Sequence, residues 1–323
     1  MNGRQQTRLH NRLMVQLYSL VMIVVLGLMP LFAVAQGDID EKAPRTSKET
    51  ASRVVEDGGT GSYKALMVSD DSLPTHTVFR PKELGALGGK QKLPIVVWGN
   101  GACANSPWEH VNFLSEVASH GFLVVAIGPM PAEGQRAGSG GPTKSPLLVG
   151  AIDWAVAQNS DKASRYFQKL DPNKIAVAGM SCGGLQALEV APDARTSTVM
   201  IFNSGILPNP GAGRGGMPGL AKEHLAKLRT PTLYLLGGEK DIAYKNGMDD
   251  VRRINHVPIF AANLDVGHGG TYRQPHGGEF AMVATAWLEW QLRGDKDAAK
   301  MFLGDPCGLA KREGWKVEKK NIP

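Results

Sequence analysis

Over most of the chain, runs of apolar residues alternate with stretches that repeat with helical spacing. Residues 94–98 and 122–127 are almost uninterrupted apolar runs, which is typical of strands buried on both faces of a parallel sheet. Between them, Ser106 marks the start of a helix and Gly121 marks its end. The pattern predicts a strand–helix–strand unit with a right-handed crossover.

The same alternation continues toward the C-terminus and predicts an α/β fold with a mostly parallel central sheet and helices on both faces. Two short strands, at 65–68 and 76–79, are expected to pair antiparallel at one edge. The stretches 128–146 and 205–218 are rich in Gly and Pro, so we expect loops there and no large lid. The remaining elements expected are helices at 147–158, 182 onward, 219–228, 243–255 and 279–292, with strands at 175–178, 198–202, 232–236 and 259–264.

Both ends of the chain differ in character from the region between them. Residues 1–35 carry arginines, then an apolar run, then Ala33-Val34-Ala35, which is the order of a secretory signal peptide. We expect residues 36–61 to be a flexible leader because they are polar and lack periodicity. The catalytic domain is predicted at 62–304 and a basic tail at 305–323, and the protein is expected to be secreted or periplasmic.

The excess of basic residues lies at the two ends of the chain. Of the formal net charge of +6, three charges come from Arg4, Arg8 and Arg12, and the tail from residue 311 supplies the other three. The main body therefore carries no excess positive charge, and no nucleic-acid partner is expected. Contact with a membrane is expected only through the signal segment before cleavage.

A candidate nucleophile lies in Gly179-Met180-Ser181-Cys182-Gly183, which fits the pattern G-x-S-x-G. The pentapeptide stands between a short apolar strand and a helix-forming stretch, which is the context of a nucleophile elbow. The flanking glycines permit the sharp turn that such a serine requires. The sequence therefore predicts that Ser181 is a nucleophile.

A serine nucleophile requires a base and an orienting acid, which should follow it in the order acid, then histidine. Asp241 follows the predicted strand at 232–236, and His268 follows the strand at 259–264 between two glycines. We expect Asp241 to be the acid, with Glu239 as the alternative. We expect His268 to be the base, with His276 as the alternative.

Two backbone N–H groups should bind the oxyanion of the tetrahedral intermediate. One is expected at Cys182, directly after Ser181, and the other at Asn100, with Gly101 next, in the loop after the strand at 94–98. Because these donors must converge, a Cys103–Cys182 disulfide is expected in an exported protein. Pairing with Cys307 and two unpaired buried thiols remain the alternatives.

Taken together, Gly99-Asn100-Gly101, the Ser181 pentapeptide, Gly237–Asp241 and Gly267-His268-Gly269 resemble the α/β-hydrolase superfamily. The resemblance covers residues 63–292 and is nearest to the dienelactone-hydrolase-like and cutinase-like serine esterase branches. It implies an α/β-hydrolase fold and hydrolysis of a small-molecule or polymeric ester. One difference is that dienelactone hydrolases use a cysteine where Ser181 stands.

Other chemistries find less support in the sequence. Residues 211–216 match the spacing of a dinucleotide-binding loop, but prolines flank them and no strand leads into them. Paired metal-ligand spacings are absent, so neither a metal nor a cofactor is expected. The sequence thus predicts a serine esterase, with a serine peptidase of the same fold or an inactive binding or adhesion protein as the alternatives.

Overall fold

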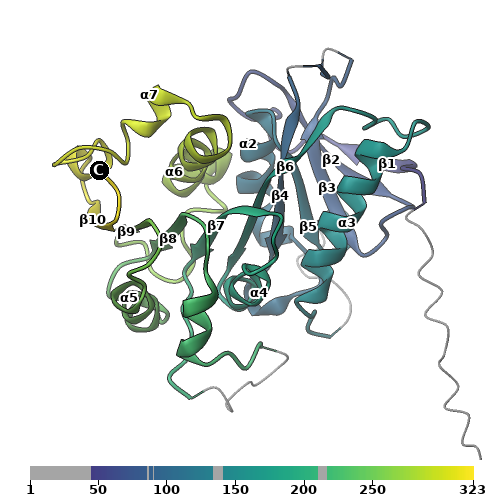
Figure 1. The fold of residues 1–323 in the computed structure, drawn as a ribbon. Helices are drawn as coiled ribbons and strands as arrows, with labels where there is room; N and C mark the ends of the chain where they lie inside the picture. Colours follow the sequence, from purple (N-terminus) through teal and green to yellow (C-terminus); the bar gives the residue numbers. More distant parts are fainter. Residues whose placement is uncertain (1–44, 86, 90, 134–140, 210–216) are drawn as a thin grey trace, which may run out of the picture. The chain divides into compact units, whose positions relative to one another are not determined.

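The computed structural model describes residues 45–323 except 86, 90, 134–140 and 210–216. These residues contain a ten-stranded sheet with the order β1-β2-β3-β5-β4-β6-β7-β8-β9-β10 (Figure 1). Neighbouring strands from β5 to β9 run parallel, so the central sheet is mostly parallel as predicted. The strands are β1 Glu49–Arg53, β2 Ala65–Asp70, β3 His76–Pro81, β4 Leu93–Gly99, β5 Leu123–Ile127, β6 Leu170–Met180, β7 Thr196–Phe202, β8 Thr232–Leu236, β9 Ile259–Asn263 and β10 Lys316–Lys320.

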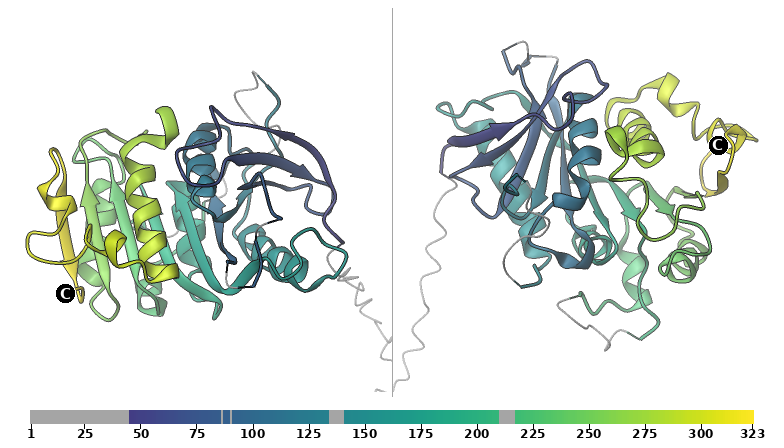
Figure 2. Two further views of the ribbon diagram at one scale, coloured as in Figure 1. Left: turned by 90° about the horizontal axis from the view of Figure 1, so that it is seen from above. Right: turned by 180° about the vertical axis from the view of Figure 1, so that it is seen from behind.

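Helices cover both faces of this sheet because successive strand residues point to opposite sides. In β4, Val97 packs with α3 and α4 side chains on one face, whereas Trp98 packs with α2 and α6 side chains on the other. The blue α2 and yellow-green α6 lie side by side in the views of Figure 2. The α-helices are α2 Val111–Ser119, α3 Pro146–Ser160, α4 Cys182–Val190, α5 Tyr244–Arg253, α6 Gly278–Leu288 and α7 Lys296–Ala299.

Two of the expected helices have a different form in the structure. Instead of an α-helix at 219–228, the chain forms the 3₁₀ helix η5, Lys222–Lys227, in which only Leu225 is buried. An apolar stripe this short does not stabilise a longer α-helix. After α6 the chain continues as one π-helical turn, Glu289–Arg293. This helical turn ends at Gly294, which has the left-handed conformation.

The sheet also extends into both segments that were expected to lie outside the folded domain. β1 falls within the predicted flexible leader and pairs antiparallel with β2. β10 falls within the predicted basic tail and pairs antiparallel with β9. Both are edge strands with polar, partly exposed side chains, so they lack the apolar alternation that reveals a strand in a sequence.

The predicted signal peptide at 1–35 and the first part of the predicted leader lie outside the described residues. Within the described part of the chain, every helix falls short of the length and apolar character that a membrane span requires.

The carboxyl ends of four neighbouring parallel strands position the candidate site. Ser181 follows β6, Asn203 follows β7, Asp241 follows β8 and His268 follows β9. Ligands of open α/β sheets bind at this edge, because loops from adjacent strands meet there. Residues separated by up to 87 positions in the sequence are thereby brought into contact.

Candidate active site

Ser181 lies on the sharp turn between β6 and α4 with a φ of 53°, in a region that non-glycine residues rarely adopt. Its N–H donates to the Phe202 carbonyl at 2.9 Å, which ties the turn to β7. A Cβ atom at Gly179 would lie 2.2 Å from the Gly183 carbonyl oxygen, and one at Gly183 would lie 2.1 Å from the Gly99 backbone. The two glycines of the pentapeptide are therefore required by close backbone packing around the serine.

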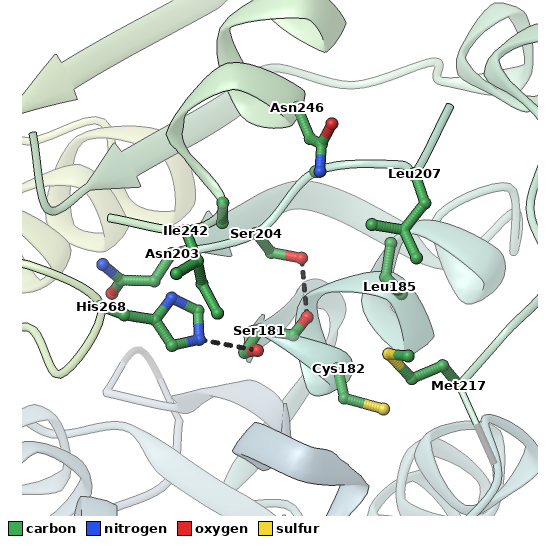
Figure 3. Close-up of a pocket in the computed structure, with 12 residues that line it drawn as sticks. Ser181, Cys182, Leu185, Asn203, Ser204, Leu207, Met217, Ile242, Asn246 and His268 are labelled. Carbon is green, nitrogen blue, oxygen red and sulfur yellow. Dashed lines mark hydrogen bonds between the residues drawn. The ribbon is translucent and has the colours of Figure 1, made fainter. Parts of the chain in front are cut away.

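His268 connects Ser181 to Asp241. Its Nε2 lies 3.0 Å from Ser181 Oγ, and its Nδ1 lies 2.6 Å from Asp241 Oδ1. Figure 3 shows the imidazole pointing toward the serine hydroxyl. The side chain of Asp241 is fully buried, whereas that of His268 is 28% exposed. This geometry allows a proton to pass from the hydroxyl to Nε2 while Nδ1–H is held by the carboxylate.

The surroundings of Asp241 favour its ionised form. Burial opposes ionisation, but hydrogen bonds from His268, the Gly237 and Ala243 amides and Asn203 hold the pKa of Asp241 below its ordinary value. The two amides donate at 3.0 and 2.9 Å and the Asn203 side chain donates at 2.8 Å. A carboxylate fixed by several donors can orient the imidazole beside it.

The alternative acid and base are not brought to Ser181. Glu239 is exposed on the turn before Asp241. His276 lies beside a different set of carboxylates, with its Nδ1 3.3 Å from Glu56 Oε2 and 3.6 Å from Glu116 Oε2. The geometry thus favours Asp241 and His268 as the partners of Ser181.

Two residues near Asp241, Asn203 and Tyr272, were not predicted from the sequence. Asn203 is fully buried and donates from Nδ2 both to Asp241 Oδ2 and, at 3.3 Å, to the Gly267 carbonyl. Its Oδ1 accepts a short hydrogen bond from the buried hydroxyl of Tyr272. The position of Asn203 directly after β7, between the strands that carry Ser181 and Asp241, was the signal that could have revealed it.

The loop after β4 approaches the first turn of α4, where the oxyanion donors were expected. Cys182 is the first residue of α4, so its N–H has no acceptor within the helix. A Cβ atom at Gly183 would lie 2.6 Å from the backbone nitrogen of Asn100. The Asn100 side chain is turned away to donate to the Ala104 and Ile127 carbonyls, which fixes the loop.

A disulfide joins Cys103 to Cys182, the pairing expected from the sequence, with a Cα–Cα distance of 5.1 Å. It links the loop after β4 to the first turn of α4. In this loop, Ala102 and Cys103 both have positive φ values, of 55° and 50°. Cys307 is buried and unpaired. The disulfide therefore holds a loop with an unfavourable backbone conformation next to Ser181.

We predict that the double variant Cys103→Ser/Cys182→Ser loses about 4 kcal/mol of unfolding free energy, because the cross-link closes a long loop in the unfolded chain. Urea unfolding of the oxidised wild type and of the variant measures the difference. Cys307→Ser, which breaks no disulfide, is the control for serine at a buried cysteine. Equal urea midpoints for the wild type and the double variant would contradict the prediction.

A cavity of about 220 Å³ opens beside Ser181 (Figure 3). It lies between the first turn of α4, the loop after β7 and the start of α5. Among the described residues, no group of three or more His, Cys, Asp and Glu side chains is arranged to hold a metal ion. The lining consists of Ser181, Cys182, Leu185, Asn203, Ser204, Gly205, Leu207, Met217, Ile242, Ala243, Asn246 and His268.

The mostly parallel sheet, with the Ser181 turn at the carboxyl end of a central strand, defines the α/β-hydrolase class. A family model described as "PETase: PET hydrolase-like" matches residues 78–246, and the chain belongs to this family. The match includes Ser181 and Asp241 and ends before His268. No curated protein matches the chain. Fold and family together identify a hydrolase of the superfamily that also contains the cutinase-like esterases.

Proposed function

We propose that this protein is an exported serine esterase that cleaves carboxylic esters through a covalent acyl-enzyme. The observation that carries the proposal is the continuous chain of contacts from Ser181 Oγ through His268 to the buried Asp241. Along the sequence, the nucleophile, the acid and the histidine follow one another in the order found in α/β-hydrolases. Membership of the PET hydrolase-like family also supports a hydrolase.

In the first half of the reaction, Ser181 Oγ attacks the carbonyl carbon of the ester and its proton moves to His268 Nε2. The N–H groups of Cys182 and Asn100 bind the oxyanion that forms. The C–O bond to the alcohol then breaks, and His268 returns the proton to the departing alkoxide oxygen. The products of this half are an alcohol and an acyl group bound to Ser181.

In the second half, a water molecule attacks the acyl carbon while His268 accepts one of its protons. The bond to Ser181 Oγ breaks, the proton returns to the serine, and a carboxylic acid leaves. Throughout both halves Asp241 keeps the Nδ1–H of His268 directed toward itself and stabilises the imidazolium. The substrate is an ester of a small molecule or of a polymer.

Export is supported by the signal-peptide pattern of residues 1–35 and by the Cys103–Cys182 disulfide, since disulfides persist in oxidising compartments. We therefore propose that the esterase acts in the periplasm or outside the cell. Incubation of the purified mature protein with p-nitrophenyl esters tests the proposed activity directly. Labelling of Ser181 by a fluorophosphonate separates an active serine hydrolase from an inactive binding protein of the same fold.

We infer that Asn203 is a positioning residue for Asp241. Asn203→Gly removes the amide while accommodating the positive φ of 43° at this position. We expect kcat to fall about tenfold with little change in KM, because the lost hydrogen bond acts on the chemical step.

A pH profile distinguishes this role from a purely structural one. The Asn203 hydrogen bond helps to hold the pKa of Asp241 down, so its loss should raise that pKa. A more basic Asp241 carboxylate binds the imidazolium of His268 more tightly, so the acidic limb of kcat/KM should move to higher pH in Asn203→Gly. Tyr272→Phe, which removes only the hydroxyl that donates to Asn203, should shift it in the same direction by less. An unshifted limb in Asn203→Gly would show that Asn203 does not act on Asp241.

A further inference from the structure

Asp250 on α5 is a buried carboxylate that lies outside the contacts described for the candidate active site. Its side chain is fully buried, which is rare for a charged group unless other groups pair with it. Oδ2 accepts a hydrogen bond from the Ile206 N–H at 2.8 Å, and Oδ1 accepts one from Lys222 Nζ at 2.5 Å. The Tyr234 hydroxyl lies 3.4 Å from Oδ2. The carboxylate thus joins α5 to two points of the chain between β7 and β8.

The contact with Ile206 fixes the loop that carries Asn203 and Ser204. Ile206 comes three residues after Asn203, and its own side chain is buried. Ser204 Oγ donates to the Ser181 carbonyl (Figure 3). Asn203 Nδ2 donates to the Asp241 carboxylate. The loop that Asp250 holds therefore contacts both the turn of the nucleophile and the acid.

Close packing makes this loop sensitive to the position of α5. A Cβ atom at Gly205 would lie 2.2 Å from the backbone nitrogen of Gly247, and one at Gly247 would lie 2.6 Å from the Ser204 carbonyl oxygen. Asn203 has a φ of 43°, a conformation that costs free energy and persists where the surrounding structure fixes it. Asp250 lies about one helical turn after Gly247, so its hydrogen bond adds to this contact between α5 and the loop.

The charge of Asp250 strengthens its hold on the loop. Burial raises the pKa of Asp250 to about 6, against the lowering effect of Lys222 beside it. At a pH well above this value the side chain is a carboxylate, and hydrogen bonds to ionised groups are about twice as strong as those between neutral groups. Lys222 Nζ also lies 2.9 Å from Asp249 Oδ2. Lys222 therefore keeps a carboxylate partner when Asp250 is made neutral.

We propose that Asp250 is a positioning residue, which holds the loop after β7 so that the Asn203 amide stays directed at Asp241. The inference rests on the proposed function, because its effect is on the turnover of an ester. Asp250 acts through the Ile206 N–H and the backbone of the loop, and not on the reacting atoms. A loop that shifts weakens the hydrogen bond from Asn203 to Asp241, and this lowers kcat while substrate binding is kept.

Asp250→Asn removes the charge but keeps the volume and an oxygen that accepts the Ile206 N–H. We expect kcat on p-nitrophenyl butyrate to fall about fivefold, with KM within about twofold of the wild-type value. Asp249→Asn is the matched control, since it removes the neighbouring carboxylate of Lys222 but leaves the Ile206 contact, so its kcat should equal that of the wild type. Asp250→Asn/Lys222→Gln, which leaves neither charge of the pair without its partner, serves if the single variant folds poorly.

A double-mutant cycle separates a positioning role from a purely structural one. Because Asp250 acts through Asn203, Asp250→Asn should lower kcat by less than about twofold when Asn203→Gly is already present. A purely structural role would lower the free energy of unfolding in both backgrounds and leave the kcat of the folded protein unchanged. Urea unfolding of each variant, with kinetics under conditions where each is folded, measures the two effects separately.

The possible results distinguish this inference from the proposed function. A fall in kcat that is present in the wild-type background and absent in the Asn203→Gly background would support it. A folded Asp250→Asn variant with wild-type kcat, or with the same loss in both backgrounds, would overturn it while leaving the esterase intact. Absence of ester turnover by the wild type and of fluorophosphonate labelling at Ser181 would overturn the proposed function, and with it the role assigned to Asp250.

Discussion

Replacement of Ser181 with alanine is expected to lower ester turnover by about four to six orders of magnitude. In the proposed mechanism the hydroxyl forms the covalent bond to the acyl carbon, and it is the group that lies 3.0 Å from His268 Nε2. Without it, only oxyanion binding and substrate positioning remain, and these give a small residual rate over water. Fluorophosphonate labelling should be lost together with the activity.

The fold of this variant should remain intact. The Ser181 N–H donates to Phe202 and its carbonyl accepts from Ser204, and both contacts use backbone atoms that alanine retains. Turnover of p-nitrophenyl butyrate, with circular dichroism to monitor folding, measures the effect. Ser160→Ala, at an exposed serine at the end of α3, is the matched control and should keep wild-type activity. Retention of more than about a tenth of the rate in Ser181→Ala would refute the nucleophile assignment.

The central part of the fold was predictable because its strands are buried on both faces. β4 and β5 are entirely buried, and this burial appears in the sequence as nearly unbroken apolar runs. The glycines around Ser181 were equally informative, since close backbone packing excludes any side chain there. Both signals are local, so they could be identified without knowledge of the tertiary structure.

Features that depend on tertiary contacts left no local signal. Glu49 of β1 bonds to Arg80 of β3, and this contact stabilises a polar edge strand that has the composition of a solvated segment. Asn203 acquires its position only when β7 lies between β6 and β8, and Tyr272 reaches it across 69 residues. The sequence could place such residues on loops, but it could not show which loops meet.

The choice between His268 and His276 as the base also depended on tertiary contacts. Its test is the second prediction with a large expected effect on activity. Both histidines stand beside glycines in the segment after β9, and the sequence favoured His268 only by its flanking residues. The structure brings His268 within 3.0 Å of Ser181 Oγ, whereas His276 lies beside Glu56 and Glu116. Proton transfer requires hydrogen-bond reach, so of these two histidines His268 is the one that we propose as the base.

We therefore expect His268→Ala to lose as much activity as Ser181→Ala, because the two residues act as one unit. The double variant Ser181→Ala/His268→Ala should be no slower than either single variant. Asp241→Asn should lower kcat by up to about 10⁴-fold, since an amide in place of the carboxylate permits the wrong imidazole tautomer. Steady-state kinetics of these four variants and the wild type on p-nitrophenyl butyrate measures these effects.

His276→Ala is the matched control, since it removes an imidazole from the same segment of the chain without touching Ser181. Its kcat should stay close to that of the wild type. The imidazole of His276 lies beside the Glu56, Asp57 and Glu116 carboxylates and away from Ser181, so any change is expected in stability rather than in the chemical step. An inactive, folded His276→Ala beside an active His268→Ala would show that the functional base comes from the other loop and that the contact of His268 with Ser181 is not the one used in turnover.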